Sequence, residues 1–346
     1  MTSDMLLSIK EIKKFILPQF DIIESDVIPV KFKNTEKQRA VFRIICRKGN
    51  YCLKKIHFNE KELLFVYSAV EWCYRKGLSV PKFIPTILNG RYITYKGMLF
   101  LLTPWFNGKK CNFDDINHVT LSIENLAVMH AKGIGFLPIE GSFIRKGFDN
   151  QYISVQKHFT DIMNCSNSAF ILHDKFSKIF LKHFPDNFDL AKKSLDILYT
   201  MDEKKLKTSL CHGDYVNKNI LVDSDNTIQV IDFDNCRYDY IARDLSYFLR
   251  RMLRRENTLW NSKLALSCIK SYQSINPLGD EDMKYIIAYL IFPQKYWRIS
   301  KDYYKNIKKF NKSSYVRLIS KVTENTEFML KFSHEMLDFM NKGFKI

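Results

Sequence analysis

A hairpin signal between residues 211 and 235 constrains the fold of this chain more than any other feature. The surrounding sequence has the apolar spacing of helices, whereas two short runs here, Asn219–Val222 and Ile228–Asp232, are rich in β-branched residues. Between them lie Asp225 and Asn226, which tolerate the backbone angles of a tight turn. We therefore expect a two-residue turn, in which the first residue of one run faces the last residue of the other.

This register would place an amide and a carboxylate side by side. Asn219 would face Asp232, and Asp214 would lie within reach on the loop that enters the same strand. Phosphoryl transfer needs a carboxylate for the proton of the acceptor hydroxyl, and oxygen ligands for the Mg²⁺ on the ATP phosphates. Each residue alone is more typical of a turn cap or a strand end, but the ordered set favours function. We expect Asp214 to be the catalytic base, and Asn219 and Asp232 to be metal ligands.

Other polar residues of this segment are expected to support the site and not to take part in the chemistry. His212, two residues before Asp214, is expected to brace the loop through hydrogen bonds. Asp244, in ARDLS, is expected to cap a helix. Three residues of the same region are candidates to line the pocket for the phosphate acceptor: Tyr215, Tyr238 and Asp239.

The motifs resemble those of a known group of enzymes. HGDYVNKN followed by IDFD and RDLS looks like the phosphotransferase motifs of aminoglycoside, choline and fructosamine kinases. Within that group, nearly the whole chain resembles the CotS family of spore-coat proteins, in the elements YCLKKI, KGLSVPKFIPT, TPWFNG, LCHGDY and IDFDN to RDLS. The resemblance implies an α+β, bilobal, protein-kinase-like fold, with a small β-rich N-terminal lobe and a large α-helical C-terminal lobe that contains the catalytic hairpin.

The same resemblance implies an ATP- and Mg²⁺-dependent kinase that transfers the γ-phosphate to a hydroxyl- or amino-bearing small molecule. It also implies synthesis in the cytoplasm of the mother cell, deposition in the spore coat, and other coat proteins as candidate partners. The alternative is a kinase-like coat protein without activity, whose role is assembly. The complete set of Asp214, Asn219 and Asp232 argues against it, because a retired site has no physical need for all three.

The pattern of apolar residues agrees with two lobes. Residues 40–46 and 51–56 are expected to form a hairpin, and Glu60–Lys76 a helix that Gly77 ends. Helical patterns dominate beyond Asn107. We expect residues 1–104 to form the nucleotide-binding lobe and residues 105–346 the catalytic and substrate lobe. The linker between them is expected at about residues 103–108, across this boundary.

The lysine that pairs with ATP phosphates is, by resemblance, Lys54. Strand alternation points Lys55 to the opposite face. An acidic partner for Lys54 should come from the following helix, where Glu60, Glu62 and Glu71 are candidates and spacing does not choose among them. Glu71 is preferred because its separation from Lys54 is closer to that usual in the family.

The adenine contacts are also expected from the resemblance. Backbone groups between Thr103 and Trp105 would hold the base, although Pro104 has no N–H to donate. The loop between Lys31 and Arg43 would cover the phosphates, but it contains no glycine, so its amides are less free to approach them.

Composition excludes several other classes of protein. The formal net charge of +17 would attract anions, although a generally lysine-rich composition accounts for it as well. No base-reading motif accompanies the charge, so we expect no nucleic-acid partner. No run approaches the roughly 18 apolar residues of a membrane span, and the N-terminus lacks a secretion signal. The 8 cysteines form no CxxC pair, which is typical of reduced thiols. The densest basic stretch, Lys301–Lys312, is interleaved with aromatic residues and is expected to be an amphipathic helix.

Overall fold

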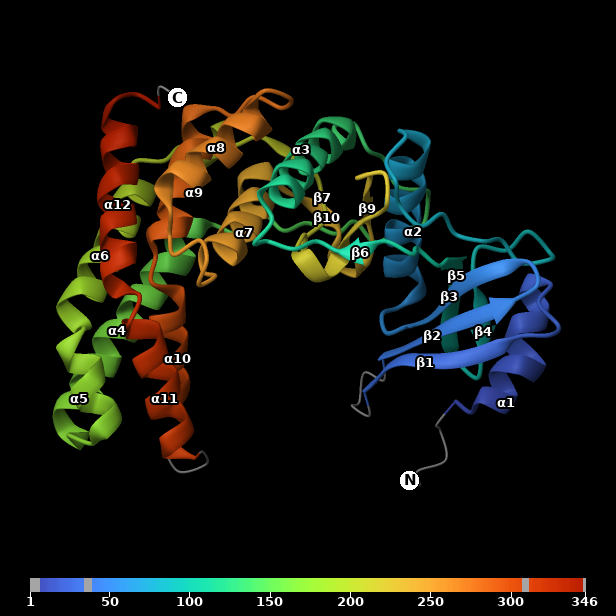
Figure 1. Ribbon diagram of the computed structural model, residues 1–346, viewed down its shortest axis with the longest axis horizontal. Coiled ribbons are helices and arrows are strands. Elements are labelled where there is room, and N and C mark those ends of the chain that lie inside the picture. The colour runs from blue at the N-terminus through green and yellow to red at the C-terminus, as the bar shows by residue number, and fades with distance from the viewer. Residues whose placement is uncertain (1–6, 34–38, 307–310, 345–346) are drawn as a thin grey trace. The chain divides into compact units, whose positions relative to one another are not determined.

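The N-terminal part of the chain forms an antiparallel sheet of five strands in the order β1-β2-β3-β5-β4 (Figure 1). The computed structural model describes residues 7–33, 39–306 and 311–344. The strands are β1 (Asp26–Lys33), β2 (Arg39–Cys46), β3 (Gly49–Ile56), β4 (Ile93–Tyr95) and β5 (Met98–Pro104). The two expected hairpin strands are confirmed as β2 and β3. The expected phosphate-covering loop falls on residues 34–38, outside the described residues.

One face of this sheet packs against the helical turns that precede it. These are α1 (Ile9–Glu11), η1 (Ile12–Ile16) and η2 (Leu17–Phe20). Ile12 and Ile16 are fully buried in one cluster with Ile44, Leu53 and Phe100 from three strands. The alternation of strand side chains aligns these apolar residues on one face, so the hydrophobic core of this sheet lies between that face and the preceding helical turns.

Helix α2 (Glu60–Arg75) follows β3 directly and confirms the expected helix. It begins with a capping box, in which the Asn59 side chain accepts from the amide of Glu62 and the Glu62 carboxylate accepts from that of Asn59. Its end at Lys76 is followed by Gly77, whose φ of 76° lies in the left-handed region that glycine adopts readily.

Two smaller sheets lie in the middle of the chain. One has the order β6-β8-β9, and the other joins β7 and β10. Their strands are β6 (Lys109–Lys110), β7 (Thr208–Cys211), β8 (Ile220–Val222), β9 (Ile228–Val230) and β10 (Arg237–Tyr240). The expected hairpin within the helical region is therefore present as β8 and β9.

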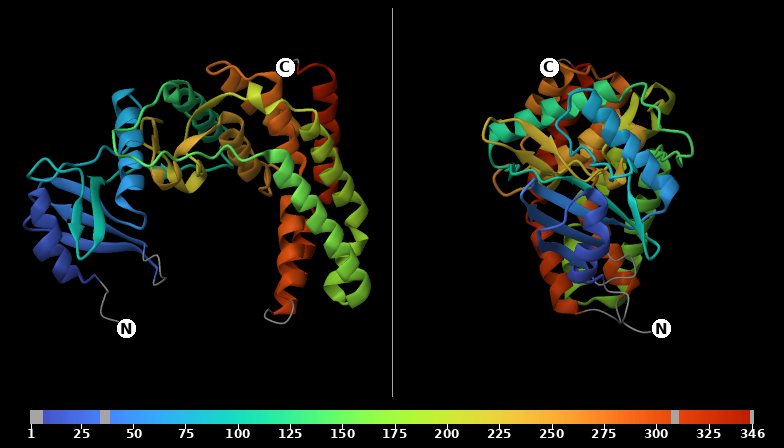
Figure 2. Two further views of the ribbon diagram at one scale, coloured as in Figure 1. Left: turned by 180° about the vertical axis from the view of Figure 1, so that it is seen from behind. Right: turned by 90° about the vertical axis from the view of Figure 1, so that its right-hand side faces the viewer.

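Most of the remaining chain is helical (Figure 2). The helices are α3 (Ile116–Gly133), α4 (Gln151–Leu172), α5 (Lys175–Lys182), α6 (Phe184–Tyr199), α7 (Ile241–Leu253), α8 (Ser262–Gln273), α9 (Asp280–Ile291), α10 (Gln294–Lys305), α11 (Lys312–Thr323) and α12 (Thr326–Asn341). Helix α9 packs against α6 and α7, and α10 packs against α4 and α11. The expected helix over Lys301–Lys312 is wrong as one element, because α10 ends at Lys305 and α11 begins at Lys312; residues 307–310 lie outside the description.

The chain divides into two compact units that differ from the expected division at residue 104. The first contains Met1–Cys111, Lys132–Lys146 and Leu210–Tyr238, and the second contains Asn112–Ala131, Gly147–Ser209 and Asp239–Ile346. The expected hairpin thus belongs to the same unit as the five-stranded sheet, because β6 continues the chain from β5 and pairs with β8. The expected α+β class, with strands toward the N-terminus and mostly helices after them, is confirmed.

Two further expectations concern the whole chain. None of the 8 cysteines, all of which lie within the described ranges, forms a disulfide. Within those ranges, we find no helix whose length and hydropathy would let it cross a membrane.

Candidate active site

The loop that carries the expected catalytic base begins where β7 ends. Gly213 has a φ of 74°, and a Cβ atom added to it would lie 2.4 Å from the backbone oxygen of Asn235. A side chain at this position would therefore be strained and would collide with backbone. This close approach brings the loop of Asp214 against η5 (Phe233–Asn235), the turn that follows Asp232.

His212 braces this loop, as its place in the motif predicted. The backbone amide of Asp214 donates to Nδ1 of His212 at 3.2 Å. Nδ1 must then be unprotonated, so Nε2 carries the proton and donates to the carbonyl of Ile231, 3.1 Å away. The fully buried imidazole thus ties the loop of Asp214 to the residue before Asp232.

The expected catalytic base is held by two neighbours. The side-chain amide of Asn219 donates to Oδ2 of Asp214 at 3.0 Å and to its backbone oxygen at 2.9 Å. The ammonium of Lys218 lies 2.9 Å from the same Oδ2. Because the Asn219 nitrogen is committed to Asp214, its Oδ1 is oriented away, and it accepts no hydrogen bond from any described residue. That oxygen is available to a cation.

The register of the hairpin differs from the expected one. Ile220 pairs with Val230, and the amide of Ile231 donates to the carbonyl of Asn219, so Asn219 faces Ile231 and not Asp232. The cause is a loop of three residues, not two. Asp223 accepts from the amides of Asp225 and Thr227 at 3.0 and 2.9 Å, and Asn226 has a φ of 60°.

Asp232 comes after the last paired residue of this hairpin. Its φ of 68° is left-handed, which is strained for a residue with a side chain and turns the backbone out of the strand. Its Oδ1 lies 2.7 Å from Nζ of Lys54. The carboxylate therefore reaches the five-stranded sheet through its side chain, not through strand pairing.

Lys54 is bound by two carboxylates. Besides Asp232, Oδ1 of Asp234 lies 2.6 Å from its ammonium. Burial by itself would lower the pKa of Lys54, but the charges of Asp234 and Asp232 outweigh it and raise this pKa above its ordinary value. Arg145 donates to the backbone oxygen of Asp234 at 2.6 Å, which holds the turn in place. This pairing brings strand β3 and the turn after β9 together within the first unit.

Glu71 does not have the position expected for it. Its carboxylate accepts from Nε of Arg75, one helical turn away, at 2.8 Å. The other two candidates are also engaged elsewhere, Glu60 with the Tyr92 hydroxyl and Glu62 in the capping box. No described glutamate of α2 pairs with Lys54. The local i,i+4 pair satisfies Glu71, whereas the two aspartates satisfy the lysine.

The expected adenine-binding segment lies at the end of β5. Thr103 pairs with Cys52 of β3, and the amide of Trp105 donates to the carbonyl of Asn50 at 2.9 Å. This amide is therefore not a free donor for a base, and the Trp105 indole lies under the guanidinium of Arg43 at 5.1 Å from the ring centroid. Pro104 has no N–H, so its carbonyl oxygen is the backbone group that this position can offer.

Comparison with known proteins decides the family. Residues 29–336 match the model of the family described as spore coat putative kinase YutH. The chain belongs to this family. The resemblance to CotS-type spore-coat proteins is thereby confirmed, and kinase-like character follows from the family.

Solved structures show the same fold as this spore-coat kinase family member. An aminoglycoside phosphotransferase from Alicyclobacillus acidocaldarius aligns with a TM-score of 0.75 at 19% identity, over 92% of this chain and 96% of that one. A spectinomycin phosphotransferase, crystallised with ADP and spectinomycin, aligns at 0.62 and 14% identity, over 94% and 99%. A microcompartment-associated aminopropanol kinase aligns at 0.58 and 15% identity, over 93% and 95%. These likenesses confirm the protein-kinase-like fold.

Sequence reasoning about this family member missed two residues of the site. Asp234 is the second carboxylate of IDFD, and its signal was its i+2 spacing from Asp232 in a turn. Lys218 had a signal in its four-residue spacing from Asp214. The residues suggested for the wall of an acceptor pocket fit that role less well. Tyr215 is fully buried, so its side chain is not accessible to a substrate.

The other residues suggested from the sequence make contacts within the protein. The Tyr238 hydroxyl donates to the carbonyl of Phe136 at 2.6 Å, and the buried Asp239 lies 3.4 Å from Arg243. Asp244 is not a helix cap, because α7 begins after Tyr240; it is buried 3.4 Å from a nitrogen of His130.

Proposed function

We propose that this protein is an ATP- and Mg²⁺-dependent phosphotransferase that acts on a hydroxyl- or amino-bearing small molecule. The observation that carries the proposal is the arrangement of Asp214, Asn219 and Asp232 around a chain reversal, with Lys54 bound to the last of them. Membership of a spore-coat kinase family supports it. Neighbours of the same fold have been crystallised with AMP-PNP and Ca²⁺, or with ADP.

Asp214 is assigned the role of accepting the proton of the acceptor hydroxyl. The Asn219 amide fixes the carboxylate at its Oδ2, and the Lys218 ammonium adds positive charge beside it. Both contacts orient Asp214 before any substrate arrives, which lowers the cost of reorganisation in the transition state.

Lys54 is assigned to the nucleotide phosphates. Its pairing with Asp232 and Asp234 keeps it protonated, so it can neutralise phosphate charge. The backbone of residues 103–105 is assigned to the adenine. Glu71 has no role in this proposal.

The residues present also fit a divalent cation of the Mg²⁺ type. Asn219 offers a carbonyl-type oxygen without a hydrogen bond from the described chain, and Asp232 offers a carboxylate, both of which are oxygen ligands that Mg²⁺ prefers. When bound, the ion supplies positive charge to the β- and γ-phosphates. Asp234 lies on the same turn and is a third candidate ligand.

The first experiment separates this proposal from a coat protein without activity. The melting temperature of the full chain is measured with and without ATP and Mg²⁺, because a ligand that binds only the native state raises it. We expect a rise at millimolar ATP that requires Mg²⁺ and is lost in Lys54→Met. No rise in the wild type would reject nucleotide binding.

The second experiment tests chemistry. ATP-dependent phosphorylation is measured across a panel of sugars, amino alcohols and aminoglycosides, with Asp214→Asn as the blank. We expect one class to be phosphorylated and Asp214→Asn to lose at least about 100-fold in rate. Binding of ATP without transfer to any acceptor would favour the alternative, an assembly role in the spore coat. Unchanged activity in Asp214→Asn would remove this residue from its role.

We also propose that the protein is made in the mother cell and deposited in the spore coat, where other coat proteins are its candidate partners. The family description supports this. Fractionation of spores with an antibody against the chain would test it, and recovery only outside the coat fraction would reject it.

A further inference from the structure

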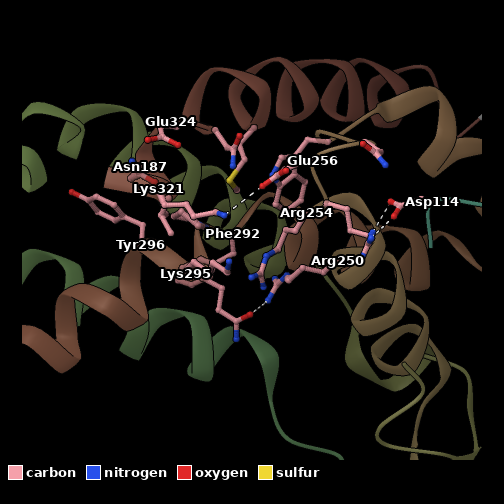
Figure 3. Close-up of a pocket in the computed structure, with 18 residues that line it drawn as sticks. Asp114, Asn187, Arg250, Arg254, Glu256, Phe292, Lys295, Tyr296, Lys321 and Glu324 are labelled. Carbon is pink, nitrogen blue, oxygen red and sulfur yellow. Dashed lines mark hydrogen bonds and ion pairs between the residues drawn. The ribbon is translucent and has the colours of Figure 1, made fainter. Parts of the chain in front are cut away.

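A pocket in the second unit is lined by positive side chains that the proposed phosphotransfer does not use. It has a volume of about 740 Å³ (Figure 3). Its walls come from the end of α7, the segment after it, the junction of α9 and α10, and the junction of α11 and α12. All of these elements belong to the second unit, so the pocket is described within one compact body.

Arg250, in the last turn of α7, is the most unusual residue of this pocket. Only 4% of it is exposed, and its Nε has no hydrogen-bond partner. Its guanidinium donates to the side chain of Gln294 and lies 3.6 Å from the ring centroid of Tyr289. No described carboxylate forms an ion pair with it. Burying a full charge without a counter-ion is costly unless something else compensates it.

Arg254, one helical turn further on, increases this excess of positive charge. It is half-buried, and no described residue pairs with it. Burial, followed by the charges of Arg250, Arg251 and Arg298, lowers the pKa of Arg254 to about 10. Like charges crowded in this way repel each other, and a bound anion would relieve that repulsion.

The carboxylates of the pocket do not neutralise these two arginines. Arg255 pairs with Asp114, and Lys321 lies 3.4 Å from Glu256. Figure 3 shows the ion pair of Asp114 at the right of the pocket and the Lys321–Glu256 pair near its middle.

After these pairs are formed, the charged lining that remains is uneven. Arg250, Arg254 and Lys295 stand against a single carboxylate, that of Glu324. Guanidinium groups bind phosphate oxygens through two parallel hydrogen bonds, and the donors without a described partner here are Nε of Arg250 and the guanidinium of Arg254. The volume exceeds that of a phosphate ion, and Trp260, Phe292 and Met329 provide apolar surface for an organic body.

We propose that this pocket binds a phosphate-bearing small molecule, with Arg250 and Arg254 as the residues that hold its phosphate. The inference does not depend on the proposed phosphotransfer, because its residues lie in the second unit and include none assigned to the reaction.

Isothermal titration of the full chain with inorganic phosphate tests the proposal, with ionic strength held constant by chloride. We expect millimolar binding that Arg254→Gln weakens at least tenfold. The matched control is Lys331→Gln, since Lys331 is exposed and does not line the pocket; we expect less than a twofold change. The Lys54→Met variant should bind phosphate as the wild type does, which separates this site from the nucleotide site.

A second variant distinguishes binding from a structural role. Arg250→Met removes a buried charge, so we expect the melting temperature without ligand to be unchanged or higher, and phosphate to no longer raise it. A lower melting temperature with phosphate binding intact would overturn the proposal, as would equal binding by wild type and Arg254→Gln. Binding of poly-glutamate but not of phosphate would also overturn it, in favour of an acidic protein segment.

Discussion

Individual residues decide the geometry of the candidate active site. His212 and Gly213 hold the loop of Asp214 against the turn that carries Asp232, one through hydrogen bonds and the other through the absence of a side chain. Lys54 then joins that turn to the sheet. Together these contacts place the carboxylates of Asp214 and Asp232 and the ammonium of Lys54 in one region.

Gly213→Ala should be strongly destabilising. It combines a left-handed backbone with a Cβ position 2.4 Å from a backbone oxygen, so we expect a loss of about 3 kcal/mol or more in unfolding free energy. The matched control is Gly135→Ala, which has a similar φ of 75° with nothing within 4 Å and should lose about 1 kcal/mol. Urea unfolding followed by circular dichroism measures both, and equal losses would contradict the steric argument.

His158 should make stability depend on pH. Burial, with the nearby charges of Lys301, Lys157 and Arg250, outweighs Asp161 and lowers the pKa of His158 to about 4. The unfolded chain binds this proton near pH 6.5, so the contribution is complete above that pH and is lost as pH falls through about 4.

Because the imidazole is partly solvated, we expect roughly 1 kcal/mol from this effect. Urea unfolding at pH 7 and pH 4.5 measures it, and His158→Phe should show a correspondingly smaller decrease in stability over that range. The same decrease in both proteins would assign the pH dependence to other groups.

At the scale of elements, the loop of the β8–β9 hairpin sets which residue faces Asn219. Asp223 closes this loop by accepting two amides, and Asn226 supplies the left-handed residue that a three-residue loop requires. The loop length thus moves Asp232 out of the paired strand and into the turn that meets Lys54.

Asp223→Ala should loosen this hairpin. It removes the acceptor for two amides, which we expect to cost about 1 kcal/mol and to weaken any Mg²⁺-dependent effect of ATP on the melting temperature. Asp225→Ala is the control, because the one described contact of the Asp225 carboxylate is with the exposed Ser224 hydroxyl at 3.3 Å. If both variants behave alike, Asp223 does not control the loop.

At the scale of the whole molecule, the two proposed ligand sites belong to different compact units. Hydrogen exchange read by mass spectrometry can therefore distinguish them. ATP with Mg²⁺ should protect residues 210–235 most, and inorganic phosphate should protect residues 250–256 and 292–296 most, because binding to the native state suppresses local opening. Protection of the same peptides by both ligands would contradict the assignment of two sites.

The fold class and the family were predictable from the sequence. Motif order and local periodicity depend on neighbours within about ten residues, and these are visible in the sequence. The helix Glu60–Lys76 and the hairpin at residues 40–56 were predicted for the same reason. The continuous helix over Lys301–Lys312 was not correct, since apolar periodicity alone does not mark where a helix ends.

Only the tertiary structure decided the partners of Lys54. Asp232 and Asp234 lie 178 and 180 residues away in the chain, and no local spacing rule reaches that far. The register of the β8–β9 hairpin was likewise decided by its loop, in which the Asp223 carboxylate accepts two backbone amides. The arginine pocket depends on three helix junctions that packing brings together. The sequence alone therefore determined which chemical groups this protein has and the family to which it belongs, and tertiary packing determined which of those groups meet.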